Sequence, residues 1–421
     1  MAKVLVMAYG NFRYFSPVSL EPYIQMFINS LVRNGNTVMP YIEKDIQSDK
    51  KFKNYKNHYI AYRNVKDFNP DIVFTFNNLM DERLLKKLDV PFYVMDADTP
   101  LYWMNKELIK KYNEKYFALI LNTEISDLLK KDFNLNEEKQ IFIPYTTDIR
   151  AKNIDQNKDI TFIGNFIQSQ WDSISCSIFN SKTNMLEKEN IMRKVVFEIK
   201  DNFKLTNETY EEYKKAFQNH AMSKNSLEAT IGMVHTNYIR NSLLNSLVDL
   251  DLNIYSTSYS LSCIDYNYKL YSKCHYNTVS TVEENEKVYN ESKISLSFPH
   301  HQTKTGFSWR VCDILATNSM LISNKTEKLT QFFGDNVVTF KDEKDLKDKC
   351  LYYLNHEDER KDIVQKCQEI INKNHRFENL FKVFEEKTGY SLINSDIKGQ
   401  IINTTRTQKI LDKYNRKNKP V

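Results

Sequence analysis

The sequence predicts an α/β protein made of two Rossmann-like domains that face a central cleft. Short apolar strands alternate with Lys-rich amphipathic helices along most of the chain, a pattern typical of parallel sheets covered on both faces. This alternation lapses once, in the polar run IRAKNIDQNK at residues 149–158, and then restarts with a new strand. A length of 421 residues suits two such domains better than a single core.

The first domain is predicted over residues 1–152. It opens with an apolar strand at Lys3–Ala8 and an amphipathic helix at Glu21–Asn34. Further strands are predicted at Thr37–Ile42, Asp71–Phe76, Pro91–Met95, Ala118–Asn122 and Gln140–Ile143.

The second domain is predicted over residues 153–375, with a polar helical elaboration at about 172–235. Its strands are predicted at Asp159–Gly164, Leu252–Tyr255, Lys293–Phe298, Met320–Ile322 and Asn336–Phe340, and its helices at 238–247 and from Glu343 and Glu357. Residues 376–421 are expected to form a crossing helix at 376–389 and then a polar tail from Ser391, whose basic end KYNRKNKPV is expected to fray.

Composition excludes several classes of protein. The 59 basic and 54 acidic residues give a net charge of +5, which is too small for this length to indicate a nucleic-acid partner. Six cysteines show no CxxC pair and no zinc-type spacing, so we expect reduced thiols and no metal site. The N-terminal apolar run is too short for a signal peptide, and no run reaches the length of a membrane helix. We expect a cytoplasmic protein that is soluble or peripheral at the inner membrane face.

The stretch from Tyr289 to Asn318 predicts an anion site, because a strand, a basic loop and a helix start follow one another there. Lys304 and Gly306 lie in the loop, and Ser308 stands where an N-cap belongs. Arg310 and Asp313 follow in the first turns of the helix. A helix N-terminus beside Lys and Arg attracts phosphate, and a carboxylate behind it can accept hydrogen bonds from a sugar diol. The alternative is an ordinary surface loop with an acidic residue that complements the helix dipole.

Two other groups of residues end predicted strands, where open parallel sheets bind ligands. Gly164 and Asn165 end the first strand of the second domain and could approach a diphosphate closely. Asp96 and Asp98 end a central strand of the first domain, and a carboxylate there could deprotonate an acceptor hydroxyl. The alternative for Asp98 is a turn before Pro100.

The chain resembles the C-terminal half of group-1 glycosyltransferases of the GT-B fold, and most closely the branch that is similar to spore-maturation proteins. The resemblance covers most of residues 230–390, and the first half matches by topology alone. The segments that carry it are Val288–Ser297, Arg310–Ala316, Glu359-Arg360, His375-Arg376, Asp159–Gly164 and, weakly, Val94–Pro100.

This sequence departs from the family's pattern at three positions. Asp313 stands where the family has Glu, and Asn318 stands where it has Gly, although Asn can take the left-handed conformation of a helix cap. Thr305 stands where the retaining enzymes have their first Glu. The roles of the two family glutamates therefore do not transfer directly.

The resemblance implies a glycosyltransferase that moves a sugar from a nucleotide-sugar donor to an acceptor hydroxyl in cell-surface polysaccharide, capsule or glycoconjugate synthesis. The second domain would bind the donor without a metal or cofactor, and the first would bind a saccharide or glycoconjugate acceptor. Asp98 and Asp96 are the candidate catalytic residues. Alternatives are a nucleotide-sugar epimerase of the same fold, a non-catalytic sugar- or nucleotide-binding protein, and a transferase of a phosphorus-containing group.

Overall fold

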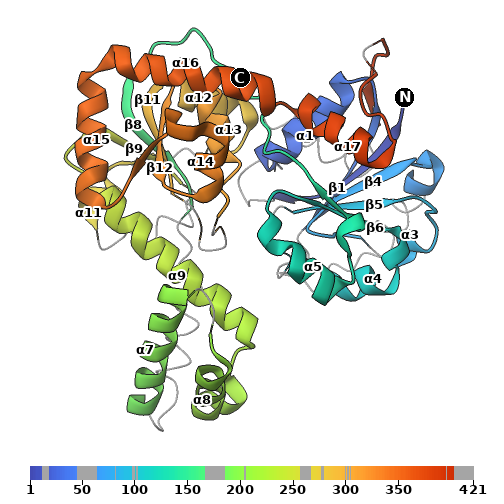
Figure 1. Cartoon of the computed structure of the whole chain (residues 1–421), viewed down its shortest axis with the longest axis horizontal. Coiled ribbons are helices and arrows are strands. Elements are labelled where there is room, and N and C mark those ends of the chain that lie inside the picture. The colour runs from blue at the N-terminus through green and yellow to red at the C-terminus, as the bar shows by residue number, and fades with distance from the viewer. Residues whose placement is uncertain are drawn as a thin grey trace, which may run out of the picture. The chain divides into compact units, whose positions relative to one another are not determined.

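The chain divides into two compact units, each built on its own sheet (Figure 1). Unit 1 comprises Met1–Ala151, Ser280–Lys287 and Gln368–Val421, and unit 2 comprises Lys152–Val279 and Val288–Cys367. The predicted α/β fold class with two Rossmann-like sheets is confirmed. The computed structural model describes the whole chain except residues 12–18, 45–63, 81, 97–99, 101–102, 166–184, 203–204, 257–266, 276–278, 299, 301–302, 304, 395 and 403–421.

The sheet of unit 1 runs in the order β14-β3-β1-β4-β5-β6-β7 over the described residues, and β2 pairs with β1. All neighbours along this path are parallel, and only the β1–β2 pair is antiparallel. Its strands are β1 (Lys3–Asn11), β2 (Ser19–Leu20), β3 (Thr37–Lys44), β4 (Ile72–Phe76), β5 (Phe92–Met95), β6 (Tyr116–Ile120), β7 (Gln140–Phe142) and β14 (Gln400–Ile401). Its helices are α1 (Pro22–Arg33), α3 (Glu82–Leu85), α4 (Lys106–Lys111), α5 (Ser126–Phe133) and α17 (Phe377–Thr388).

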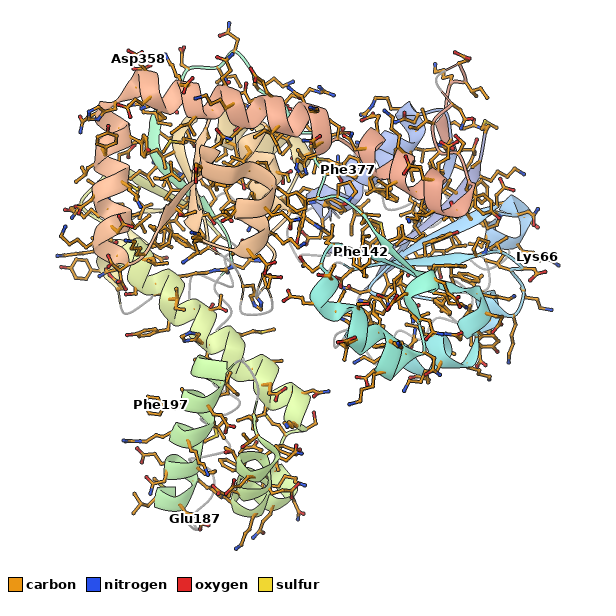
Figure 2. All side chains as sticks on the ribbon, viewed as in Figure 1. Lys66, Phe142, Glu187, Phe197, Asp358 and Phe377 are labelled. Carbon is orange, nitrogen blue, oxygen red and sulfur yellow. The ribbon has the colours of Figure 1, made fainter. Side chains whose placement is uncertain are left out.

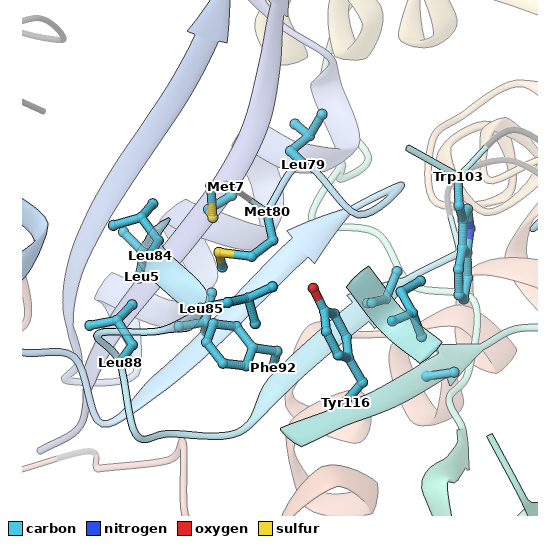
Figure 3. Packing of buried hydrophobic residues seen from close by; sticks show 14 of the residues in the cluster. Leu5, Met7, Leu79, Met80, Leu84, Leu85, Leu88, Phe92, Trp103 and Tyr116 are labelled. Carbon is cyan, nitrogen blue, oxygen red and sulfur yellow. The ribbon is translucent and has the colours of Figure 1, made fainter. Parts of the chain in front are cut away.

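Both faces of this sheet are covered by apolar side chains. On one face, leucines of α3 pack with Met80 and Phe92, as Figure 3 shows. On the other, α1 and α17 bring aromatic rings together: Phe384 lies 4.8 Å from Tyr93 and 5.4 Å from Phe74 between ring centroids. The helix 377–388 therefore completes the core of unit 1, because its buried face closes the sheet.

The polar segment that follows Ser391 packs within unit 1 where it is described. The Asn36 side chain donates to the Leu392 carbonyl at 2.7 Å, and the backbone of 400–402 pairs beside β3. Gly35 has a φ of +82°, and a Cβ there would lie 2.2 Å from the Asn394 carbonyl oxygen. Only glycine fits this close approach. The basic end KYNRKNKPV lies outside the described residues.

The sheet of unit 2 runs in the order β10-β9-β8-β11-β12-β13 over the described residues, and every pair is parallel. The chain first builds outward from β8 through β9 and then returns to build outward on the other side from β11. The switch point therefore lies between β8 and β11. The strands are β8 (Lys158–Ile163), β9 (Leu252–Tyr255), β10 (Cys274–His275), β11 (Ser292–Ser297), β12 (Met320–Asn324) and β13 (Val338–Phe340).

The helices of unit 2 cover both faces of its sheet. Leucines of α9 and α15 share one core with Ile294 and Leu296 of β11, and α13 packs against β11 and β12 on the other face. The helices are α7 (Met185–Asn202), α8 (Asn207–Phe217), α9 (Lys224–Asn245), α11 (Tyr268–Tyr271), α13 (Arg310–Leu315), α14 (Glu327–Phe333) and α15 (Glu343–Asn355). Two further helices, α12 (Val282–Asn290) and α16 (Glu357–Asn374), contain the positions where the chain passes between the units.

The polar region at about 172–235 forms helices with a small core of their own where it is described. Leu227 and Ile231 of α9 pack with residues of α7 and α8, whereas Leu243 and Leu244 of the same helix join the core of the sheet. The predicted helix at 238–247 is thus the second half of one long helix that connects two cores. Phe197 of α7 is 63% exposed and points away from this helical group (Figure 2).

No helix among the described residues is long and apolar enough to cross a membrane.

Candidate functional site

The carboxyl edge of the unit 2 sheet carries an arginine at its switch point. Arg240 of α9 donates from Nη1 to the Asn165 carbonyl at 2.7 Å and from Nη2 to the Phe298 carbonyl at 3.0 Å. Asn165 follows β8 and Phe298 follows β11, so one guanidinium joins the ends of the two strands where the sheet changes direction. Ligands of open parallel sheets bind at this position.

The charge of Arg240 is buried and is not neutralised within the described part of the chain. Its side chain lies over the Phe162 ring at 6.0 Å, and only 8% of the residue is exposed. No described carboxylate forms an ion pair with it, and its Nε has no hydrogen-bond partner there. Burial and then the charge of Arg310 lower the pKa of Arg240 to about 10. An anion at this edge would stabilise the charged guanidinium.

Gly164 allows the chain to turn closely around the end of β8. A Cβ at this position would lie 2.4 Å from Cζ of Phe162, so a larger residue would displace the ring. That ring stacks on Phe298 at 5.3 Å between centroids and supports Arg240. Gly164 therefore keeps the arginine and its aromatic support in place, and the exposed Asn165 follows it at the surface.

The predicted loop and helix start are only partly described. Lys304 lies outside the described residues, and Gly306 is buried. Helix α13 begins at Arg310 with Trp309 as its N-cap residue, so the prediction of Ser308 as the N-cap is wrong by one position. Ser308 still serves this end of the helix, because its Oγ accepts a hydrogen bond from the Arg310 N–H at 3.4 Å.

Arg310, Asp313 and Tyr289 are electrostatic neighbours. The pKa of the Tyr289 hydroxyl is raised, mainly by burial. The positive charge of Arg310 opposes this shift, and the negative charge of Asp313 adds to it. Asp313 is 8% exposed and Tyr289 is 1% exposed. The Tyr289 hydroxyl, like Nε of Arg240, has no hydrogen-bond partner among the described residues.

Asn318 does not use the left-handed conformation that asparagine can adopt in place of glycine. Its side chain instead donates to the Lys152 carbonyl at 2.5 Å, and its carbonyl accepts from the Gln156 side chain at 2.8 Å. These two hydrogen bonds hold the segment 152–156, which precedes β8, against Asn318. Asparagine in place of glycine is thus explained by these contacts, since its amide supplies a donor that glycine lacks.

In unit 1, Asp96 directly follows β5 at the carboxyl edge of the sheet, as predicted from the end of that strand. Asp98 lies outside the described residues. Asn77 and Asn78, which follow the neighbouring strand β4, both have positive φ, and the Asn78 side chain donates to the Met104 carbonyl at 2.8 Å. Asp96 therefore stands beside a turn of fixed conformation.

His375 and Arg376, which are part of the family resemblance, bind backbone in unit 1. Nδ1 of His375 lies 2.8 Å from the Tyr145 carbonyl, and Nη1 of Arg376 donates to the carbonyls of Thr147 and Ile149 at 3.1 and 2.6 Å. Both side chains hold the segment that follows β7. Burial lowers the pKa of His375, so the neutral ring donates from Nδ1.

The structure brings four predicted residues to the carboxyl edge of the unit 2 sheet, namely Gly164, Asn165, Arg310 and Asp313. It adds Arg240 and Tyr289, which sequence reasoning missed. Arg240 stands inside a helix, close to the apolar positions Leu243 and Leu244, where arginine is an ordinary helix residue. Its role becomes visible only when the strand order is known.

Residues 240–386 match a family model described as glycosyl transferase-like. No curated protein sequence matches the chain. Among solved structures, sucrose-phosphate synthase from Thermosynechococcus elongatus is 8% identical over 93% of this chain and 98% of its own, with a TM-score of 0.55. The Anabaena protein HepE, solved with UDP and glucose, is 7% identical over 92% of this chain and 100% of its own, with a TM-score of 0.51.

TarM from S. aureus is also similar, at 10% identity over 78% of this chain and a TM-score of 0.44, and the chain spans 58% of the length of TarM. The two matches with a TM-score above 0.5, sucrose-phosphate synthase and HepE, show the GT-B fold. The family match over residues 240–386 agrees with the resemblance to glycosyltransferases expected for that part of the chain.

Proposed function

We propose that the protein transfers a sugar from a nucleotide-sugar donor, bound at the carboxyl edge of the unit 2 sheet, to an acceptor hydroxyl. The observation that carries this proposal is the buried, unneutralised guanidinium of Arg240 at the switch point, with the charge of Arg310 close enough to lower its pKa. Two adjacent positive charges destabilise each other unless an anion lies beside them. A diphosphate supplies that anion.

The residues of unit 2 have distinct roles in this proposal. Arg240 and Arg310 stabilise the negative charge that develops on the leaving nucleoside diphosphate, and they offset it without a metal or cofactor. Asp313, one turn along α13, accepts hydrogen bonds from the ribose diol. Gly164 and Asn165 leave room for the diphosphate at the end of β8. Lys304 and Gly306, which precede α13 in the chain, complete the proposed set of donor-binding residues, and Lys304 lies outside the described residues.

Asp96 and Asp98 of unit 1 are the proposed catalytic carboxylates. A carboxylate there removes the proton from the acceptor hydroxyl as it attacks the anomeric carbon, while the bond to the diphosphate breaks. Asp96 at the carboxyl end of β5 supports this assignment by its position. The saccharide or glycoconjugate acceptor belongs to cell-surface polysaccharide synthesis in the cytoplasm or at the inner membrane face, as the resemblance to the spore-maturation branch suggests.

Uridine nucleotides are the first donors to test, because HepE was solved with UDP and glucose and has the same fold. Calorimetry with UDP and a panel of nucleotide sugars should detect binding to the wild-type protein in the presence of a chelator. Arg310→Gln should weaken it about tenfold or more, since a charge-assisted phosphate contact is lost. Arg193→Gln is the control, because Arg193 is exposed and pairs with Glu189 at 2.7 Å.

Product analysis then separates transfer from its rivals. Incubation with donor and an acceptor panel should yield a glycosylated acceptor and free nucleoside diphosphate. Release of an epimerised donor without acceptor would instead identify an epimerase, and binding without turnover would identify a binding protein. Equal affinity of wild-type protein and Arg310→Gln for every nucleotide would contradict the proposed donor site.

A further inference from the structure

Unit 1 has a hollow at the amino ends of β5, β6 and β7, opposite the edge that carries Asp96. Its volume is about 480 Å³, which falls in the range of roughly 300–1,000 Å³ typical of ligand pockets. The hollow exists because α17 covers β4 and β5 with Phe384 and ends at Thr388. Beyond the end of this helix, Phe117 of β6 is only half-buried, whereas Tyr93 and Ile141 lie beneath the hollow and are 2% and 4% exposed.

The floor of this hollow is aromatic and apolar. The rings of Tyr93 and Phe117 stack at 5.2 Å between centroids, and Ile141 of β7 extends the same surface. Gly389, with a φ of +74°, turns the chain after α17, and Tyr390 then forms a wall that is 40% exposed. A flat apolar ligand face can pack on the accessible parts of the Phe117 and Tyr390 rings.

The rim of the hollow carries charges of both signs. Asp89, Glu114 and Glu138 contribute carboxylates, and Lys115 and Lys387 contribute ammonium groups. Lys115 is held in place, since it donates to the Leu88 carbonyl at 2.9 Å and lies 3.3 Å from Asp89. A cationic ligand would meet the lysines and an anionic ligand would meet the carboxylates. The rim therefore favours a neutral ligand that both donates and accepts hydrogen bonds.

We infer that this hollow is a saccharide-binding site separate from the proposed catalytic residues of unit 1. A neutral pyranose has an apolar C–H face that packs on aromatic rings and a rim of hydroxyl groups that pair with carboxylates and ammonium groups. The inference rests on the proposed function in one respect: the saccharide held here is a distant part of the acceptor. Such a second contact keeps a chain-like acceptor bound by raising its effective concentration.

Saturation-transfer NMR and calorimetry test this site with neutral linear oligomers of glucose, of galactose and of N-acetylglucosamine. At least one of these probes should bind the wild-type full-length chain without nucleotide. Tyr390→Ala and, separately, Glu138→Gln should each weaken binding about tenfold, because one removes a ring contact and the other a charged acceptor. Phe142→Ala is the matched control, since Phe142 is a 45% exposed aromatic residue of β7 that does not line the hollow.

Each outcome decides the matter. Loss of binding in Tyr390→Ala and Glu138→Gln, with binding kept in Phe142→Ala and Arg310→Gln, supports the site. Absence of binding by all three probes to the wild-type chain, or equal affinity in Tyr390→Ala and wild-type protein, overturns it. The saccharide probes are tested without nucleotide, so these results do not depend on donor binding. The saccharide site can therefore be disproved while the proposed sugar transfer stands, and the proposed transfer can be disproved while the saccharide site stands.

Discussion

Arg240 of unit 2 and Arg376 of unit 1 are both buried, but they differ in how completely the chain satisfies their hydrogen-bond donors. Arg240 and Arg376 are each 8% exposed, and each donates to two backbone carbonyls. Arg376 also donates from Nε and Nη2 to Asn372 at 3.1 and 2.7 Å, whereas Nε of Arg240 has no partner among the described residues. A fully satisfied buried charge indicates a structural role, and an incompletely satisfied one indicates a ligand.

The strongest test of this difference is Arg240→Met. Nucleotide affinity and sugar transfer should fall about 100-fold, equivalent to about 2.7 kcal/mol, because the anion loses a buried positive charge. The free energy of unfolding of unit 2 should change by less than about 1 kcal/mol, since removal of an unneutralised charge offsets the two lost carbonyl bonds. Calorimetry and urea unfolding measure the two quantities. If Arg240→Met unfolded at a much lower urea concentration than wild type but bound nucleotide with unchanged affinity, the role of Arg240 would be structural.

Arg376→Met should have the opposite profile. It leaves the carbonyls of Thr147 and Ile149 without their donor, so the free energy of unfolding of unit 1 should fall by about 2 kcal/mol. Nucleotide affinity of the folded protein should stay within a factor of two of wild type. Arg33→Met is a useful comparison, because Arg33 is a partly exposed arginine of the same unit that pairs with Asp148 at 2.8 Å. A large loss of nucleotide affinity in Arg376→Met would contradict the assignment of a structural role to Arg376 and a ligand-binding role to Arg240.

Tyr289→Phe should have a smaller effect. The Tyr289 hydroxyl is fully buried without a hydrogen-bond partner in the described structure, so its removal should raise the free energy of unfolding of unit 2 by about 1 kcal/mol. Urea unfolding measures this gain. A decrease would mean that the hydroxyl binds a group that stabilises the folded state, and a parallel loss of nucleotide affinity would identify that group as part of the donor site.

The smallest expected effect is the pH dependence contributed by His375. Burial lowers its pKa in the folded state, so the unfolded chain takes up a proton more readily. Its contribution to stability is present above the unfolded pKa of about 6.5 and is lost as the pH falls below that value. His375→Asn keeps a donor for the Tyr145 carbonyl without a titrating ring. Unit 1 of this variant should lose less stability than wild type between pH 7.5 and 5.5 in urea unfolding, and an equal loss would exclude His375 as the cause.

Much of this fold could be predicted from the sequence, because apolar periodicity is a local signal. β9 begins and ends at the predicted residues, Leu252 and Tyr255, and α15 and α16 begin at the predicted Glu343 and Glu357. Two features had no comparable signal. β14 has only two paired residues, and the first half of α9 packs with α7 and α8 instead of the sheet.

The candidate site was less predictable than the fold. Gly164 and Arg310 could be selected because they end a strand and begin a helix, which are positions visible in the sequence. Arg240 is reached only through long-range contacts: its two carbonyl partners are 75 and 58 residues away. Which strand ends it joins depends on the order of the sheet, and that order is set by packing of the whole unit.

The division of unit 1 into separate segments has a consequence for its synthesis. The sheet of unit 1 begins with β1 at Lys3, but α17 and β14 follow the whole of unit 2 in the chain. During translation, Phe74 of β4 and Tyr93 of β5 therefore stay without their contact to Phe384 until unit 2 has been made. Unit 2 can complete its sheet first. Until then, unit 1 exposes an apolar surface that a chaperone can recognise.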